Sequence, residues 1–180
     1  MTTAEYLGTP ESVLPQELAF GVWRVAESPT PRHQEAVLGL TLALHTHVRS
    51  HHSGTVWLSP LDVILDYERA LVVQPDLFII SNERAHILTD RVRGAPDLVV
   101  EVLSPRPRVG DINERVRWFA EYDVRECWIV HQVERWIDVL TFGGGKTVTR
   151  RRFAADDRIE SGVLPEFTAS LADILGYAPG

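Results

Sequence analysis

Two acidic residues lie at or within short apolar stretches that are typical of β-strands. Glu101 is in the middle of PDLVVEVLSP (residues 96–105), and Asp76 precedes the apolar part of QPDLFII (residues 74–80). An ionised carboxylate among apolar side chains is costly unless a partner neutralises it. If the two strands are neighbours, a divalent cation would offset both this cost and the mutual repulsion of the carboxylates. Mg²⁺ suits such a pair because it takes hard oxygen ligands, often with water and phosphate completing its shell.

Each of these acidic residues also has a purely structural explanation. Pro-Asp is a common turn pair, so Asp76 or Asp97 could cap the start of a strand. Glu101 could lie at a sheet edge with its carboxylate in water. Residues two apart in a strand share a face. The alternation therefore puts the side chain of Glu101 on the same face as those of Asp97, Val99 and Leu103. The side chains of Leu98, Val100 and Val102 point to the opposite face.

A basic residue, Arg115, lies on the apolar face of a helix predicted from Asp111 to about Tyr122. Asp111 suits the N-cap, and Glu114 three residues later approximates a capping box. Helical spacing puts Arg115 on the same face as Ile112, Val116 and Phe119. Its guanidinium either snorkels toward water or a carboxylate, or it reaches Asp76, Glu101 and a phosphate. Arginine stays protonated near neutral pH, so charge stabilisation is open to it and proton transfer is not.

The surrounding sequence predicts a mixed order of helices and strands. A helix over residues 30–48 begins with Thr30 as its cap and Pro31 in its first turn. A short helix in residues 168–176 ends at Gly176. Short apolar and β-branched stretches predict strands within residues 17–27, 55–60, 61–67, 70–80, 96–105, 126–131, 135–142 and 146–153. The simplest fold class is mixed α/β, with a central mixed sheet flanked by helices.

Composition indicates an ordinary globular protein with one domain over residues 1–180. Hydrophobic residues make up 44% and charged residues 24%. No apolar run is long enough to span a bilayer, and the first residues do not resemble a signal peptide. Cys127 is the single cysteine, which fits a reducing cytoplasm. The net charge of −7 argues against non-specific coating of nucleic acid but leaves room for a local basic groove.

Several segments together resemble a known family. VVQPDLFII, GAPDLVVEVLSP, an aspartate six residues after Pro105 and VRECWIV are similar to bacterial restriction endonuclease domains of formerly unknown function, in the PD-(D/E)XK nuclease superfamily. The similarity covers about residues 28–142. It implies a restriction-endonuclease-like fold that binds Mg²⁺, with Mn²⁺ as a substitute, and that cuts phosphodiester bonds in DNA.

The resemblance also implies roles for individual residues. By position, Asp76 and Glu101 match the metal-binding acids of the family, and the carbonyl of Val102 would be a further ligand. The family has a lysine four residues after the aspartate that matches Asp111. That position is Arg115 in this chain.

The chain departs from the family pattern at three places, namely Arg115 for lysine, Phe119 for tyrosine, and His131-Gln132 for Asp-Pro. Two hypotheses follow. In the first, the protein is a Mg²⁺-dependent DNA endonuclease in which Asp76 and Glu101 hold the ion and Arg115 stabilises charge on the phosphate. In the second, it is a catalytically silent nuclease fold that serves as a nucleic-acid or protein interaction module. A homodimer is expected because nucleases that cut both strands often act as two-fold dimers.

Other residues carry weaker signals. His33 matches a histidine common in the family and either packs or lines the site. Glu35 lies where related nuclease folds sometimes place an additional acid, but it is more simply a solvated helix-face residue. Four histidines gather late in the first helix, at His45, His47, His51 and His52. His47 and His51 are one helical turn apart, a spacing that occurs in zinc sites. Polar or cationic side chains are also favourable at a helix C-terminus, which would explain the histidines without a metal. The basic segments 106–111 and 149–153 could contact a nucleic-acid backbone.

Overall fold

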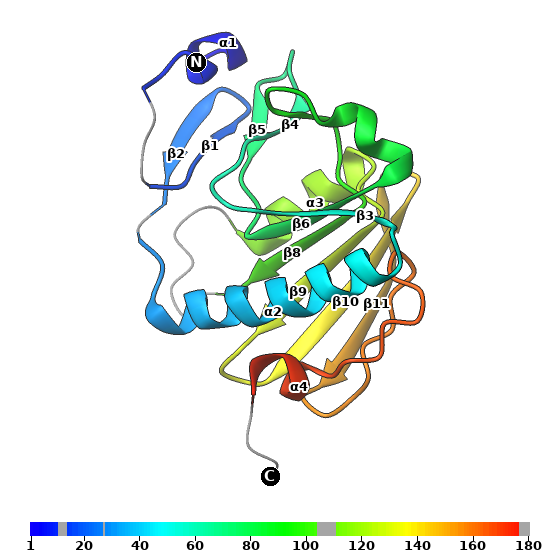
Figure 1. Ribbon diagram of the computed structural model, residues 1–180. Coiled ribbons are helices and arrows are strands. Elements are labelled where there is room, and N and C mark those ends of the chain that lie inside the picture. Colours follow the sequence, from blue (N-terminus) through cyan, green and yellow to red (C-terminus); the bar gives the residue numbers. More distant parts are fainter. Residues whose placement is uncertain (11–13, 27, 104–110, 177–180) are drawn as a thin grey trace.

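The protein forms two mixed β-sheets with helices packed around them, as the computed structural model shows for residues 1–10, 14–26, 28–103 and 111–176 (Figure 1). The six-stranded sheet has the order β11-β10-β9-β8-β6-β3. Its strands are β3 (Gly54–Leu58), β6 (Leu77–Ser81), β8 (Leu98–Val102), β9 (Glu126–His131), β10 (Trp136–Gly143) and β11 (Lys146–Ala154). The five-stranded sheet has the order β2-β1-β5-β4-β7. Its strands are β1 (Gln16–Ala19), β2 (Val22–Val25), β4 (Val63–Asp66), β5 (Leu71–Val73) and β7 (Val92–Arg93).

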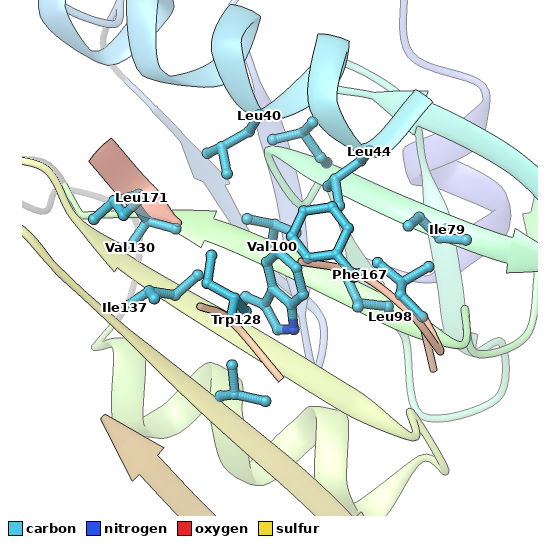
Figure 2. Close-up of a cluster of buried hydrophobic side chains, with 14 of the residues drawn as sticks. Leu40, Leu44, Ile79, Leu98, Val100, Trp128, Val130, Ile137, Phe167 and Leu171 are labelled. Atoms are coloured by element: carbon cyan, nitrogen blue, oxygen red, sulfur yellow. The ribbon is translucent and has the colours of Figure 1, made fainter. Parts of the chain in front are cut away.

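The six-stranded sheet is the central layer. The helices α2 (Pro31–Ser50) and α4 (Leu171–Leu175) cover one face, where Leu40 and Leu44 pack with Val100 and Trp128 (Figure 2). The opposite face packs on α3 (Ile112–Glu121) and on the five-stranded sheet. The expected mixed α/β class, with a central mixed sheet flanked by helices, is confirmed. The second sheet was not expected.

The alternation predicted for β8 is confirmed by its packing. Leu98, Val100 and Val102 belong to the core under α2, whereas Val99 belongs to the core under α3. Burying one such aliphatic side chain contributes about 1.5–3 kcal/mol, so the register of this strand is strongly fixed. Glu101 is consequently held on the α3 side of the sheet.

Local signals at the helix ends are mostly as expected. The Thr30 side chain accepts the backbone N–H of His33 at the start of α2, and Asp111 accepts the N–H of Asn113 at the start of α3. Gly176 ends α4 with a left-handed backbone. The capping box predicted at α3 is wrong, because the Glu114 carboxylate binds Arg24 Nη1 at 2.9 Å. None of the described helices is both long enough and apolar enough to cross a bilayer.

Two predicted strands are each divided in the structure. Residues 17–27 do not form one strand, because Phe20 and Gly21 both have positive φ and turn the chain into a β1–β2 hairpin. The stretch 70–80 divides into β5 in one sheet and β6 in the other. The chain changes sheets at Gln74 and Pro75, directly before Asp76. Remaining short elements are α1 (Thr3–Leu7) and a 3-10 helix, η1 (Asn82–Ile87).

Candidate active site

Asp76 and Glu101 are brought together by the pairing of β6 with β8. These strands are antiparallel and pair Leu77 with Val100, so one further step of the register puts Asp76 beside Glu101. The backbone N–H of Val102 donates to Asp76 Oδ2 at 2.8 Å. Asp76 therefore accepts a backbone hydrogen bond at the end of the ladder, which is the kind of structural role expected for an aspartate at the start of a strand.

Arg115 extends from α3 to the carboxylate of Glu101. Its Nε and Nη2 atoms donate to Glu101 Oε1 at 3.0 Å and 2.5 Å. Only 6% of Arg115 and 8% of Glu101 are exposed, so the guanidinium does not snorkel into water. The Phe119 ring, one turn later on α3, lies 5.6 Å from Arg115 Cζ and packs beside the guanidinium.

Glu17, on β1, is a third carboxylate of this cluster, and sequence reasoning missed it. Its Oε1 atom accepts hydrogen bonds from Arg115 Nη1 and from the backbone N–H of Gln74, the latter at 2.9 Å. Glu17 is 3% exposed and is followed by buried apolar residues. The signal that identified Glu101, an acid in an apolar strand, was therefore present here too. A single strand over residues 17–27 gives no reason to expect Glu17 beside Glu101.

His33, at the start of α2, lines the site. Its Nε2 atom lies 3.2 Å from Asp76 Oδ2. Burial lowers the pKa of His33, but the hydrogen bond and charge of Asp76, together with Glu101 and the Val102 backbone, outweigh burial, and the net shift of the pKa is upward. Of the two roles left open for His33, the structure shows site lining. Glu35 is exposed, in line with a solvated helix-face residue.

The cluster holds an excess of negative charge. Glu101 and Glu17 pair with one arginine, Arg115, while Asp76 pairs with the titratable side chain of His33. Burial raises the pKa of Glu101 to about 8; Arg115 opposes this rise, and the charges of Asp76 and Glu17 add to it. In contrast, the two carboxylates raise the pKa of Arg115 despite its burial, so this side chain stays cationic. A further cation is the electrostatic complement of such a cluster.

The donor set fits a hard divalent cation. No hydrogen bond from the described residues reaches Asp76 Oδ1 or Glu101 Oε2. No three His, Cys, Asp or Glu side chains of the described residues form a metal-binding group. An ion held by Asp76 and Glu101 would therefore depend on the Val102 carbonyl, water and substrate oxygens for the rest of its shell, which is usual for Mg²⁺.

Other candidate residues lie in structural roles. Asp97 accepts the backbone N–H of Ser81 at 2.7 Å and does not join the cluster. His131 Nδ1 accepts the N–H of Glu134 at 2.9 Å, and Gln132 is buried. In the basic segment 149–153, two arginines are paired with one carboxylate, as Arg150 and Arg152 both bind Asp138. Residues 106–110 of the other basic segment lie outside the described residues.

The histidines late in α2 do not form a zinc site within the described residues. The rings of His47 and His51 stack with centroids 4.1 Å apart. His51 Nε2 lies 3.4 Å from Glu166 Oε2. The ring stacking, the contact with Glu166 and the position at the helix end explain the arrangement of His47 and His51 without a metal.

The sheet that brings Asp76 beside Glu101 belongs to a fold that a solved structure shares. The crystal structure of "a putative nuclease belonging to DUF820" from Anabaena variabilis ATCC 29413 is similar over 98% of each chain, with a TM-score of 0.82 and 16% sequence identity. That likeness shows the fold. The Uma2 family, described as "Putative restriction endonuclease", matches residues 4–172. The chain belongs to the Uma2 family, and this membership supports a nuclease role. No match was found among curated proteins.

Proposed function

We propose that this protein is a divalent-metal-dependent endonuclease that hydrolyses phosphodiester bonds in DNA. The observation that carries the proposal is the convergence of Asp76, Glu101 and Arg115 from β6, β8 and α3. Asp76, Glu101 and the Val102 carbonyl would hold Mg²⁺, with Mn²⁺ as a substitute. The bound ion would supply Lewis-acid chemistry, lowering the pKa of a water molecule and neutralising charge on the phosphate.

In this proposal Arg115 stabilises negative charge on the phosphate and does not transfer a proton. The two carboxylates raise its pKa, so it neither donates nor accepts a proton during the reaction. Its five N–H donors can bind phosphate oxygens and stabilise the charge that develops on them. Activation of the water molecule is left to the metal. His33, which contacts Asp76, would orient that carboxylate.

A second candidate function rests on the same arginine. Arg115 already donates twice to Glu101 Oε1, and it thereby neutralises the acid that a metal would use. If that ion pair persists, the fold is a catalytically silent module that binds nucleic acid or protein. The first candidate takes precedence because the excess of carboxylates over Arg115 leaves a place for one more cation.

Cleavage of supercoiled plasmid DNA in Mg²⁺ or Mn²⁺ tests the two candidates. The endonuclease proposal predicts nicking or linearisation that chelator abolishes. Asp76→Asn and Glu101→Gln should lower the rate about a hundredfold or more, and Glu35→Gln, on the exposed face of α2, is the matched control. A protein that binds DNA and Mn²⁺ but leaves the plasmid intact would favour the silent module.

The oligomeric state belongs to the same proposal. Breaking both strands of a duplex requires two active centres or two successive events at one centre, and a two-fold homodimer provides the former. Sedimentation equilibrium should therefore give twice the mass of the chain. A monomer that produces only nicked circles would restrict the proposal to cleavage of single strands.

A further inference from the structure

Glu17 connects the two sheets at the candidate active site. It lies on β1 of the five-stranded sheet, while Glu101 lies on β8 of the six-stranded sheet, and Arg115 donates to both. The same oxygen of Glu17 accepts the N–H of Gln74, two residues before Asp76. Glu17 is thus hydrogen-bonded both to Arg115 and to the segment that carries Asp76.

The second carboxylate oxygen of Glu17 is unused. Oε2 is buried and has no hydrogen-bond partner in the described structure. Leaving a buried carboxylate oxygen without a donor destabilises the fold, so this arrangement needs an explanation. Arginine and carboxylate groups pair best through two parallel N–H···O bonds. Arg115 and Glu17 form one, while Nη2 of Arg115 is given to Glu101.

A cation on the free Oε2 atom of Glu101 would take up part of the negative charge that now holds Arg115 at Oε1. Two cations that share one carboxylate repel each other, and a buried guanidinium with a weakened ion pair is destabilised unless another acceptor compensates. Among the described residues, Glu17 and Glu101 are the two carboxylates that Arg115 contacts. The free Oε2 atom of Glu17 offers the missing second acceptor, without any need for Arg115 to leave the site.

We propose that Glu17 is a positioning residue that retains Arg115 beside the site when a divalent cation takes Glu101. In the metal-free protein Arg115 bridges Glu17 and Glu101. In the metal-bound protein it forms two parallel hydrogen bonds with Glu17 Oε1 and Oε2, and its other N–H groups become available to the phosphate. The inference rests on the proposed metal-dependent function. It adds that the divalent cation replaces the guanidinium of Arg115 as the partner of Glu101.

Crystal structures of the native protein with and without Mn²⁺ test the inference directly. The metal-free crystal should show Arg115 Nε and Nη2 on Glu101. The Mn²⁺ crystal should show the ion on Glu101 and Arg115 on both oxygens of Glu17. An ion on Glu101 with Arg115 still bound to it would overturn the role of Glu17 while leaving the metal site intact. No ion at Glu101 would overturn both this role and the proposed function.

Calorimetric titration with Mn²⁺ gives a second readout that does not depend on cleavage. Glu17→Gln should weaken Mn²⁺ binding roughly tenfold because Arg115 then keeps its hold on Glu101. Glu17→Asp, which retains the charge, should recover part of that loss. Glu114→Gln is the matched control, since Glu114 also pairs an arginine between α3 and β2 but does not contact Arg115. If Glu17→Gln binds Mn²⁺ like the native protein although its melting temperature falls, Glu17 is only structural and the inference is wrong.

Discussion

Replacing Arg115 by methionine should lower stability strongly in the absence of metal. The change keeps an aliphatic stem but removes the three hydrogen bonds that Arg115 donates to Glu101 and Glu17. Two buried carboxylates then lose their common counter-ion, which typically costs about 3–5 kcal/mol. For a chain of this size, 1 kcal/mol corresponds to about 2–4 °C in melting temperature. The expected decrease is therefore about 6–20 °C.

Divalent metal should compensate for the lost arginine. An ion at one hundred times its dissociation constant adds about 2.7 kcal/mol to the free energy of unfolding. In Arg115→Met the ion no longer competes with a guanidinium for Glu101, so Mn²⁺ should raise the melting temperature more than in the native protein. The assay is thermal unfolding followed by circular dichroism, with and without Mn²⁺ and with chelator as a reference.

The matched control for this experiment is Arg117→Met. Arg117 lies on the same helix but is exposed, and its loss should change the free energy of unfolding by no more than about 0.5 kcal/mol. The reasoning would be refuted if Arg115→Met melted as close to the native protein as Arg117→Met does. It would also be refuted if Mn²⁺ stabilised the native protein more than the Arg115→Met variant.

Three further predictions concern the charges of the site. Arg115→Lys should retain or increase metal-dependent plasmid cleavage, whereas Arg115→Ala should reduce it about a hundredfold; equal rates in both would refute a role for this charge. Burial raises the pKa of Glu101, so Mn²⁺ binding to its ionised carboxylate should release protons when the pH is below that raised pKa, and calorimetry in buffers of different ionisation enthalpy would show it. The raised pKa of His33 stabilises the fold below its ordinary pKa of about 6.5, and this contribution is lost as the pH rises through the raised value. Urea unfolding should therefore show a smaller decrease in stability across that window for His33→Gln than for the native protein.

Features with a strong local cause could be predicted from the sequence. The two faces of β8 follow from strand alternation, and the starts of α2 and α3 follow from the capping side chains of Thr30 and Asp111. The adjacency of the strands that carry Asp76 and Glu101 was expected from the resemblance and is observed in the structure. The faces of β8 and the helix starts depend on few residues that are close together in the chain, whereas the pairing of β6 with β8 does not.

Features that depend on contacts between distant segments could not be predicted. Glu17 and Arg115 are separated by ninety-eight residues and meet because β1 lies in a second sheet that packs on α3. Pro75 and Asp76 mark a break in the stretch 70–80, but the similar apolar patterns on both sides of Pro75 do not show that the two parts belong to different sheets. For the same reason, the capping box expected at α3 failed. The Glu114 carboxylate pairs with Arg24 of the β1–β2 hairpin and does not accept a hydrogen bond at the start of α3.

The central claim is that Asp76 and Glu101 together hold one divalent cation. The most direct test is calorimetric titration of the native protein with Mn²⁺, compared with Glu101→Gln under the same conditions. The account predicts one ion per chain for the native protein and loss of that binding in Glu101→Gln. Titration curves that are identical for the two proteins, or a native protein that binds no ion, would contradict it.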